Sequence, residues 1–385
     1  MRAIAAVTTS RADYGIYRPL LRRLADDEGI DLQLIVGGMH LKAEFGDTIG
    51  EIESDGFPIS EKVDLLSAAD TPAAIAEAMG RGTAGFGQAF ARLRPDIAVV
   101  LGDRFEMFAA AAAAQPFRLP LAHIHGGELT LGAIDDSFRH AMTKLSHIHF
   151  AAAEDYGRRI RQMGEEAWRV HVSGALGLDN LGLVQPLQGK ELEEAVGMVL
   201  DEPPLVITYH PATRGSADVE AQADALAEAL DGMERPLVIT APNADEGGRR
   251  LQERFRAFAA GRPRRRYVEN LGTRGYFGLM AVAAAMVGNS SSGIIEAASF
   301  KLPVVNIGRR QEGRLRPANV IDAGESAEDI LAGIDRALAA EFRGGLADLR
   351  NPFQGERPAA EAIHATLVSL AIDGRLLNKR FVDMR

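Results

Sequence analysis

Two short segments carry acidic and histidine side chains at positions where they could move protons. LGDRFE (101–106) places Asp103 and Glu106 at the end of an apolar run, and HIHGGE (123–128) ends a second apolar run. Carboxylates and imidazoles in this combination can act as general acids and bases. A His-x-His pair with nearby carboxylates can also bind zinc, although no strong metal spacing is present. The third interpretation is structural, with Asp103 capping the helix that follows.

The segment DDSFRH (135–140) opens a helix with two adjacent acids. Asp135 and Asp136 in a first turn suit the helix dipole, which is a purely structural explanation. Asp136, Arg139 and His140 nevertheless lie within about one turn and can face a common site.

A serine-rich loop, GNSSSG (288–293), indicates anion binding in the second half of the chain. Its backbone N–H groups and its hydroxyls, at Ser290, Ser291 and Ser292, can hold a phosphate at a helix N-terminus. The loop is neither a P-loop nor a GxGxxG turn, so a nicotinamide enzyme is unsupported. Glu296 follows in the same helix and can accept hydrogen bonds from ribose hydroxyls, or it can be an ordinary exposed glutamate.

Further polar residues follow other predicted strands. His210 and Asn243 suit recognition of a base or phosphate, and Arg310 lies in a basic loop that can close over a diphosphate or simply be solvated. Arg11 lies in a polar turn, SRADYG (10–15), that can hold an anion or merely begin a helix.

These residues need strands and helices that bring them together. Short β-branched runs alternate with helical periods, which predicts βαβ units and parallel sheets with ligands beyond the carboxyl ends of the strands. The predicted strands are 3–8, 31–36, 97–101, 121–124, 149–152 and 169–172 in the first half, and 205–208, 236–240, 266–268, 286–287 and 304–306 in the second. A glycine-rich junction at 173–188 separates the two halves.

Composition excludes several classes of protein. The chain of 385 residues contains no cysteine, which rules out disulfides, thiolate metal sites and cysteine nucleophiles. Its net charge of −10 disfavours nucleic-acid binding. With neither a signal-peptide pattern nor an apolar run of membrane length, we expect a cytoplasmic protein that does not bind membranes.

Taken together, the motifs resemble those of the hydrolysing UDP-N-acetylglucosamine 2-epimerases of bacterial sialic- and legionaminic-acid pathways. The matching segments span nearly the whole chain in family order: SRADYG (10–15), PDIAVVLGDRFE (95–106), HIHGGE (123–128), DDSFRHAMTKLSH (135–147), YHP (209–211), PN (242–243), GNSSSGIIE (288–296) and NIGRRQEGR (306–314).

The resemblance implies an α/β fold of the glycosyltransferase-B type, with two Rossmann-like domains flanking a cleft. Residues 1–178 would form the sugar-side domain and 179–358 the UDP-side domain, with a helix and tail at 359–385 returning to the first domain. Arg11 and Arg104 would reach the diphosphate from the first domain. UDP would be held by His210, Asn243, Ser290, Ser291, Ser292, Glu296 and Arg310.

The implied reaction needs neither a metal nor a cofactor. A base removes the C2 proton while UDP leaves C1, and water adds to the resulting glycal with inversion at C2. The free manno-configured sugar and UDP are the products. Asp103, Glu128 and one of Asp135 or Asp136 match the family's catalytic carboxylates, with His125 as a further candidate.

Three alternatives remain open at this stage. A non-hydrolysing epimerase would interconvert UDP-sugars, a glycosyltransferase of the same architecture would leave C2 unchanged, and a sensor would bind nucleotide sugars without turnover. The sugar's C4 and C6 substituents and the choice between UDP and GDP also stay open. We expect a homo-oligomer, either a dimer or a tetramer.

Overall fold

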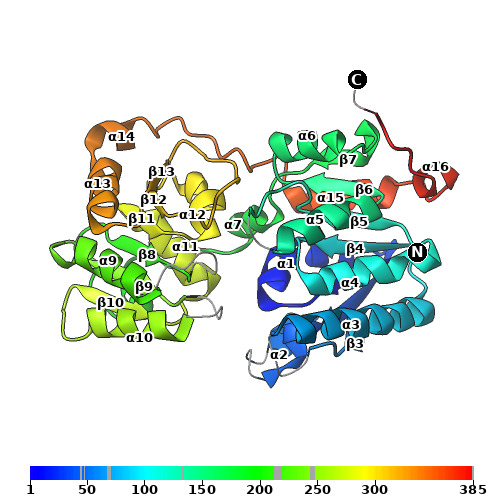
Figure 1. Cartoon of the computed structure of the whole chain (residues 1–385), viewed down its shortest axis with the longest axis horizontal. Helices are drawn as coiled ribbons and strands as arrows, with labels where there is room; N and C mark the ends of the chain where they lie inside the picture. The colour runs from blue at the N-terminus through cyan, green and yellow to red at the C-terminus, as the bar shows by residue number, and fades with distance from the viewer. Residues whose placement is uncertain are drawn as a thin grey trace. The chain divides into compact units, whose positions relative to one another are not determined.

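The computed structural model describes residues 1–43, 46, 48–66, 71–131, 134–211, 219–242 and 248–383. The chain divides into two compact units. The N-terminal unit comprises Met1–Leu129, Ala133–Asn180 and Pro352–Arg385, and the C-terminal unit comprises Thr130–Gly132 and Leu181–Asn351. Each is an α/β unit built on a parallel sheet (Figure 1), which confirms the predicted fold class of two Rossmann-like domains.

The sheet of the N-terminal unit has the strand order β3-β2-β1-β4-β5-β6-β7 within the described residues. Every pairing is parallel. The strands are β1 (Arg2–Thr8), β2 (Ile30–Gly37), β3 (Ile59–Val63), β4 (Ile97–Leu101), β5 (Leu121–Ile124), β6 (Ile148–Ala151) and β7 (Val170–Val172). Six of them were predicted to within about a residue, and β3 was missed because its alternating sequence ISEKV is mostly polar.

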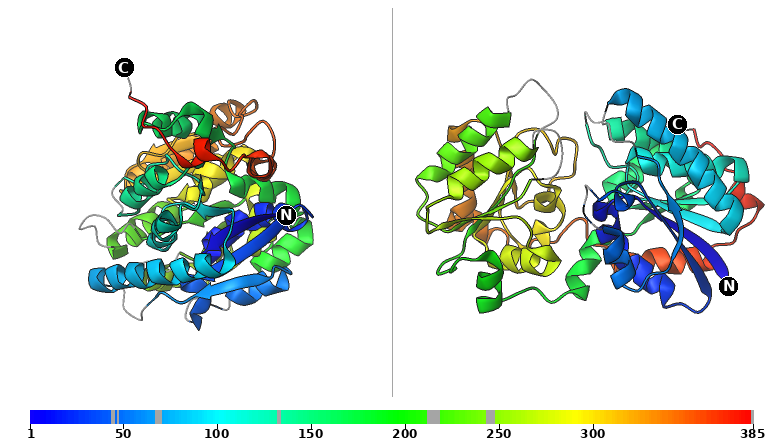
Figure 2. Two further views of the ribbon diagram at one scale, coloured as in Figure 1. Left: turned by 90° about the vertical axis from the view of Figure 1, so that its right-hand side faces the viewer. Right: turned by 90° about the horizontal axis from the view of Figure 1, so that it is seen from below.

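Helices cover both faces of this sheet. The helices α3, α4 and α5 pack in sequence against one another, whereas α1 packs on α15. Figure 2 shows α3 and α15 on opposite faces of the strands. The helices are α1 (Arg11–Ala25), α2 (Thr48–Ser54), α3 (Pro72–Leu93), α4 (Phe105–Ala114), α5 (Ile134–Leu145), α6 (Glu154–Gln162), α15 (Ala359–Ser369) and α16 (Gly374–Leu377).

The sheet of the C-terminal unit has the order β10-β9-β8-β11-β12-β13, again with parallel pairings throughout the described strands. The strands are β8 (Leu205–Thr208), β9 (Leu237–Thr240), β10 (Arg265–Val268), β11 (Ala285–Gly288), β12 (Val304–Ile307) and β13 (Val320–Ala323). The last strand, β13, was not predicted from the sequence.

The two faces of this sheet bury different residues because side chains alternate along a strand. Leu205, Ile207 and Val287 pack under α9 (Val219–Asp231), α10 (Gly248–Ala259) and α13 (Ala327–Leu338). Val206 and Met286 pack on the other face with α8 (Gly189–Val196) and α11 (Gly272–Val282). The remaining helices are α7 (Asn180–Leu183), α12 (Ser291–Ile295) and α14 (Ala340–Gly344).

A buried carboxylate anchors the C-terminal tail to the N-terminal unit. Glu165 is 2% exposed and accepts hydrogen bonds from Lys144 at 2.5 Å, Lys379 at 2.9 Å and His149 at 3.1 Å. Lys379 also donates to the backbone carbonyls of Lys144 and Ser146, so it satisfies groups at the end of α5. Burial alone would raise the pKa of Glu165, but these partners outweigh it and lower the pKa to about 2.

Replacing Glu165 by glutamine should lower the free energy of unfolding by about 3 kcal/mol, because the partly buried Lys379 and the more exposed Lys144 lose their buried counter-charge. The carboxylate stabilises the fold fully above its ordinary pKa of 4.5 and loses this effect as the pH falls through about 2. Urea unfolding of both proteins should therefore show a difference that shrinks over that pH interval.

Glu154→Gln provides the control, because its exposed ion pair with Arg161 should contribute less than about 1 kcal/mol. An equal loss in both variants, or a difference that does not change with pH, would contradict the anchoring role of Glu165.

Candidate active site

The loop after β4 presents Asp103 at the carboxyl edge of the sheet. Gly102 adopts φ +76°, which turns the chain away from the strand. The N-cap of α4 is Arg104, without a side-chain capping bond, so the alternative that Asp103 caps this helix is wrong. The Asp103 carboxylate instead forms an ion pair with Arg139 from α5.

The loop after β5 joins an imidazole to a carboxylate. Nδ1 of His125 lies 2.5 Å from Oε1 of Glu128, and their side chains are only 10% and 5% exposed. The other ring nitrogen, Nε2, is buried without a hydrogen-bond partner in the described part of the chain. Such a pair can accept or donate a proton at Nε2. His125 also has φ +64°, a strained conformation of the kind found at functional sites.

Gly127 of this loop allows the chain to approach the helix α6 closely. A Cβ atom on Gly127, which has φ +75°, would lie 2.4 Å from the carbonyl oxygen of Tyr156 in α6. Arg159 of the same helix donates to the carbonyl oxygen of Gly127. The chain between His125 and Glu128 is therefore held against α6.

Arg139 connects the two loops. Its side chain is 4% exposed, and it pairs with Asp103, donates to the His125 carbonyl oxygen at 2.7 Å and lies 3.9 Å from Oε2 of Glu128. The sequence placed Arg139 near Asp136 and His140 on one turn but did not identify it as a site residue. The sequence did hold a signal for Arg139: it follows Asp135 and Asp136 closely, in the segment after the predicted strand 121–124.

His123 supports the turn after β4. It is fully buried, and burial lowers its pKa to about 3, so the ring is neutral. Its Nε2 lies 2.8 Å from the carbonyl oxygen of Gly102, to which a neutral ring can donate. This bond joins the loop after β4 to β5.

The acids of α5 occupy its first turn, as predicted. Asp136 lies 3.6 Å from Nε2 of His140. Burial raises the pKa of Asp135, and the negative charge of Asp103 raises it further. Asp135 is thus electrostatically coupled to the Asp103 carboxylate. Across the described residues, no group of three or more His, Asp or Glu side chains is placed to hold a metal ion.

Arg104 is held beside these acids by a second buried carboxylate. Its Nη2 lies 2.7 Å from Oε1 of Glu106, which is fully buried. Burial opposes the charge of Arg104, but Glu106 and Asp13 outweigh it and raise its pKa. Glu106 therefore orients an arginine. Arg11, by contrast, is 57% exposed and pairs with Glu51 at 3.0 Å.

In the C-terminal unit, Asn289 joins the loops after β8 and β12. It accepts from the backbone N–H of His210 at 2.7 Å and donates to its carbonyl oxygen at 2.8 Å. Arg310 donates to the carbonyl oxygen of Asn289 at 3.1 Å. Burial, followed by the charge of Arg310, lowers the pKa of His210 to about 3, which keeps the ring neutral. Asn243 lies outside the described residues.

The predicted serine loop begins α12. Ser290 is its N-cap and accepts from the N–H of Ser292 at 3.3 Å, while Ser291 and Ser292 remain partly exposed. Glu296 ends the helix, and burial raises its pKa to about 7 against the opposing charge of Arg314. The C-terminal unit thus gathers neutral donors, Arg310 and Arg314, and a carboxyl group whose pKa lies near neutrality.

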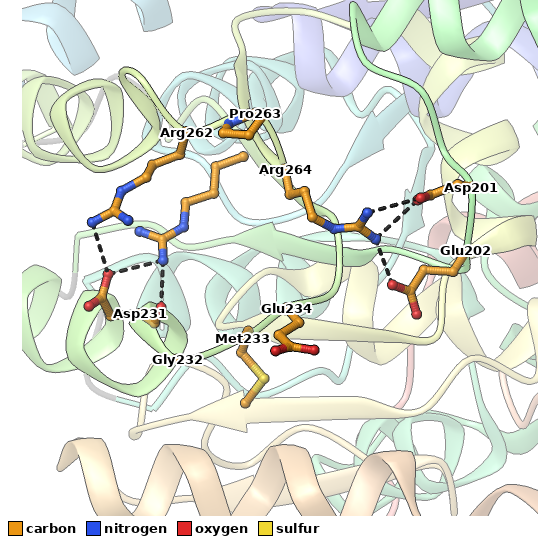
Figure 3. A pocket seen from close by; sticks show the side chains of 10 residues that line it. Asp201, Glu202, Asp231, Gly232, Met233, Glu234, Arg262, Pro263 and Arg264 are labelled. Carbon is orange, nitrogen blue, oxygen red and sulfur yellow. Dashed lines mark hydrogen bonds and ion pairs between the residues drawn. The ribbon is translucent and has the colours of Figure 1, made fainter.

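A surface hollow in the C-terminal unit lies elsewhere (Figure 3). Its lining precedes β8, β9 and β10, at the amino ends of these strands. Its arginines are paired: Arg264 binds Asp201 and Glu202, and Arg265 binds Asp231. Ligands of parallel sheets bind beyond the carboxyl ends, so this hollow is separate from the candidate site.

Gly127→Ala tests the close approach of the β5 loop to α6. A left-handed alanine costs about 1–2 kcal/mol by itself, and the contact with Tyr156 should add about 1–3 kcal/mol to the lost stability. Gly102→Ala is a matched control, since it shares the positive φ but its Cβ would meet nothing within 4 Å. Equal losses in the two variants, measured by urea unfolding, would contradict the steric argument.

Comparison with known proteins places this geometry in a family. A family model described as UDP-N-acetylglucosamine 2-epimerase matches residues 22–368. The GDP/UDP-N,N'-diacetylbacillosamine 2-epimerase (hydrolyzing) of Campylobacter jejuni is 38% identical over 100% of this chain and 99% of that protein. The UDP-N,N'-diacetylbacillosamine 2-epimerase (hydrolyzing) of Legionella pneumophila is 38% identical over 88% of this chain and 89% of its own.

The fold agrees with these sequence relationships. The crystal structure of UDP-GlcNAc 2-epimerase from Neisseria meningitidis bound to UDP-GlcNAc superposes with a TM-score of 0.81, at 18% identity, over 96% of this chain and 100% of that one. No helix among the described residues is long and apolar enough to cross a membrane. The resemblance inferred from the motifs is confirmed, and the chain belongs to the UDP-N-acetylglucosamine 2-epimerase family.

Proposed function

We propose that this protein is a hydrolysing 2-epimerase, which converts a UDP-linked 2-acetamido sugar into UDP and the free manno-configured sugar. The observation that carries this proposal is the convergence of Asp103 and Glu128 on one buried arginine, with His125 bound to Glu128. Two relatives that are 38% identical to the chain are named as hydrolysing enzymes, which favours hydrolysis over reversible epimerisation.

The two carboxylates have different surroundings and therefore different proposed roles. Asp103 is 20% exposed, whereas Glu128 is 5% exposed and contacts Nδ1 of His125. Asp103 acts on the sugar directly as acid or base, and Glu128 acts with His125, whose Nε2 exchanges the proton. Asp135, coupled to Asp103, is the third carboxyl of the set. A base held close to the weakly acidic C2–H gains from orientation and partial desolvation.

Elimination breaks the C1–O bond and leaves one more negative charge on the departing diphosphate, so cationic groups must meet the developing charge. Arg104 is preorganised for this role by its bond to Glu106. Arg11, on the same edge of the unit, exchanges its surface partner Glu51 for the diphosphate. Water then adds its hydroxyl to C1 and a proton to C2 of the glycal, from the face that inverts C2.

The C-terminal unit recognises the nucleotide in this proposal. Asn289 and Arg310 hold the loop that carries neutral His210 beside the serine loop. The serine hydroxyls and the N–H groups of 290–292 donate to phosphate oxygens. Glu296 accepts hydrogen bonds from the ribose hydroxyls.

For the sugar, we give first place to 2,4-diacetamido-2,4,6-trideoxyglucose, since two relatives at 38% identity are named for N,N'-diacetylbacillosamine. UDP-N-acetylglucosamine is second, because a polysialic acid biosynthesis protein of Escherichia coli is 35% identical over 94% of this chain and 93% of its own. The cytoplasmic location and the dimer or tetramer stay predictions.

Product analysis tests the reaction. Incubated with the UDP- and GDP-linked forms of the diacetamido sugar and with UDP-N-acetylglucosamine, the enzyme should release nucleoside diphosphate and free manno-configured sugar in equal amounts from at least one of them. In heavy water the product should carry deuterium at C2. Asp103→Asn and Glu128→Gln should lower kcat by at least about 10²-fold, as expected for lost acid–base groups.

Asp201→Asn, which changes an exposed ion pair with Arg264 in the hollow separate from the candidate site, should retain the wild-type rate. A manno-configured UDP-sugar without free UDP would identify the non-hydrolysing reaction instead. Product with no deuterium at C2 would indicate sugar transfer or simple hydrolysis. Tight UDP binding without any turnover would indicate a sensor.

The raised pKa of Glu296 predicts a pH dependence of nucleotide binding. Only the ionised carboxylate accepts both ribose hydroxyls, so UDP affinity should fall as the pH drops through about 7. Hydrogen bonds to a charged group contribute about 1.5–3 kcal/mol, which predicts at least tenfold weaker binding by Glu296→Gln at high pH.

Calorimetric titration of UDP into both proteins separates this effect from ionisation of the ligand, since the ligand is common to both. The ratio of the two dissociation constants should approach one below the pKa of Glu296. A ratio that stays constant with pH would show that Glu296 does not bind the ribose as a carboxylate.

A further inference from the structure

We infer that Arg139 is a positioning residue of this reaction: its guanidinium fixes Asp103 relative to the Glu128–His125 pair. This inference rests on the proposed function and extends it to a residue outside the predicted catalytic set. From helix α5, the Arg139 side chain reaches two other chain segments, the loop after β4 and the loop after β5.

The contacts use different edges of the guanidinium. Nη2 pairs with Asp103, while Nη1 donates to the His125 carbonyl oxygen at 2.7 Å and lies 3.9 Å from Glu128. A planar group with donors in a fixed fork can hold these acceptors at defined angles, whereas an ammonium group is a flexible point charge. The bond to the carbonyl also supports the strained backbone of His125, at φ +64°.

The position of Arg139 itself is fixed by the helix that carries it. One turn further on, Thr143 donates to the carbonyl oxygen of Arg139 at 3.1 Å and lies 3.5 Å from Nδ1 of His123. At the end of α5, Lys144 is bound to buried Glu165 at 2.5 Å. Because α5 is anchored at its C-terminal end, it holds the guanidinium of Arg139 in a fixed position.

The charges around Arg139 explain why it is needed. Its carboxylate neighbours, Asp103, Glu128 and Asp136, all favour its charged form, against the opposing effect of burial. Without the cation, carboxylates from two loops would repel one another in a partly desolvated site. Among the described residues, the charge of Arg139 also acts on His123, Asp135 and His140.

The test compares Arg139→Lys and Arg139→Gln with the wild-type enzyme. Misplacing a catalytic group by about 1 Å can cost about 10²-fold in rate, so kcat should fall at least that much in both variants, while KM changes by less than about fivefold. In Arg139→Gln the carboxylates should bind protons more readily, which moves the acid limb of the pH–rate profile to higher pH. Guanidinium ion, added below denaturing concentrations, should restore part of the kcat of that variant.

Arg169→Lys is the matched control. Arg169 is a fully buried arginine of the same unit, but it bonds to the backbone carbonyls of His147, Arg375 and Leu376 and to Glu166. The Arg169→Lys variant should lose stability while it keeps the wild-type kcat and pH–rate profile. UDP titration of each variant checks that the C-terminal unit still binds nucleotide.

The outcomes separate the inference from the proposed function. Wild-type enzyme that releases sugar and UDP while Arg139→Lys keeps its kcat and pH profile would overturn the positioning role alone. A loss of activity in Arg139→Lys that matches its loss of folded protein, as measured by urea unfolding, would do the same. Absence of turnover by the wild-type enzyme on every nucleotide sugar would overturn the function, and the inference with it.

Discussion

The pairing of β4 with β5 is the constraint on which the candidate site depends. The two strands run parallel with Leu101 opposite Ile124, so both end at the same level of the sheet. The N–H of Gly102 donates to the carbonyl oxygen of Ile124 at 2.9 Å, which continues the register past the strands. Asp103 and His125 therefore emerge side by side, although they are 22 residues apart in sequence (125 − 103). A shift of one residue would turn the alternate side chains to the other face.

The two units satisfy their buried polar groups in different ways. The N-terminal unit buries full charges in ion pairs, such as Arg139 with Asp103 and Arg104 with Glu106. The C-terminal unit relies on amide and hydroxyl groups, and Asn289 satisfies both backbone groups of His210. Paired charges give strong electrostatic preorganisation for a reaction that moves protons. Neutral donors suffice for recognising a ligand that brings its own charge.

Strand ends and their loops could be predicted from the sequence because they depend on local pattern. LGDRFE and HIHGGE follow runs of buried residues, and both lie where the sheet places ligands. The pairing of Arg139 with Asp103 joins residues 36 positions apart, and no local periodicity encodes it. For the same reason the sequence could not show that Glu106 is the partner of Arg104. The strands β3 and β13 were missed because partly polar, half-exposed edges lack the apolar signal.

Contacts with neighbouring segments hold the strained backbone of the loop after β5 in place. His125 keeps a positive φ because its N–H donates to Phe150 at 2.9 Å and its carbonyl accepts from Arg139. Gly127 also keeps a positive φ, and α6 leaves no room there for a side chain. A flexible loop would relax and let the imidazole turn toward solvent. Since the surrounding bonds determine the backbone at both positions, the His125–Glu128 pair keeps its geometry without help from a ligand, as the proposed role in proton transfer requires before a substrate arrives.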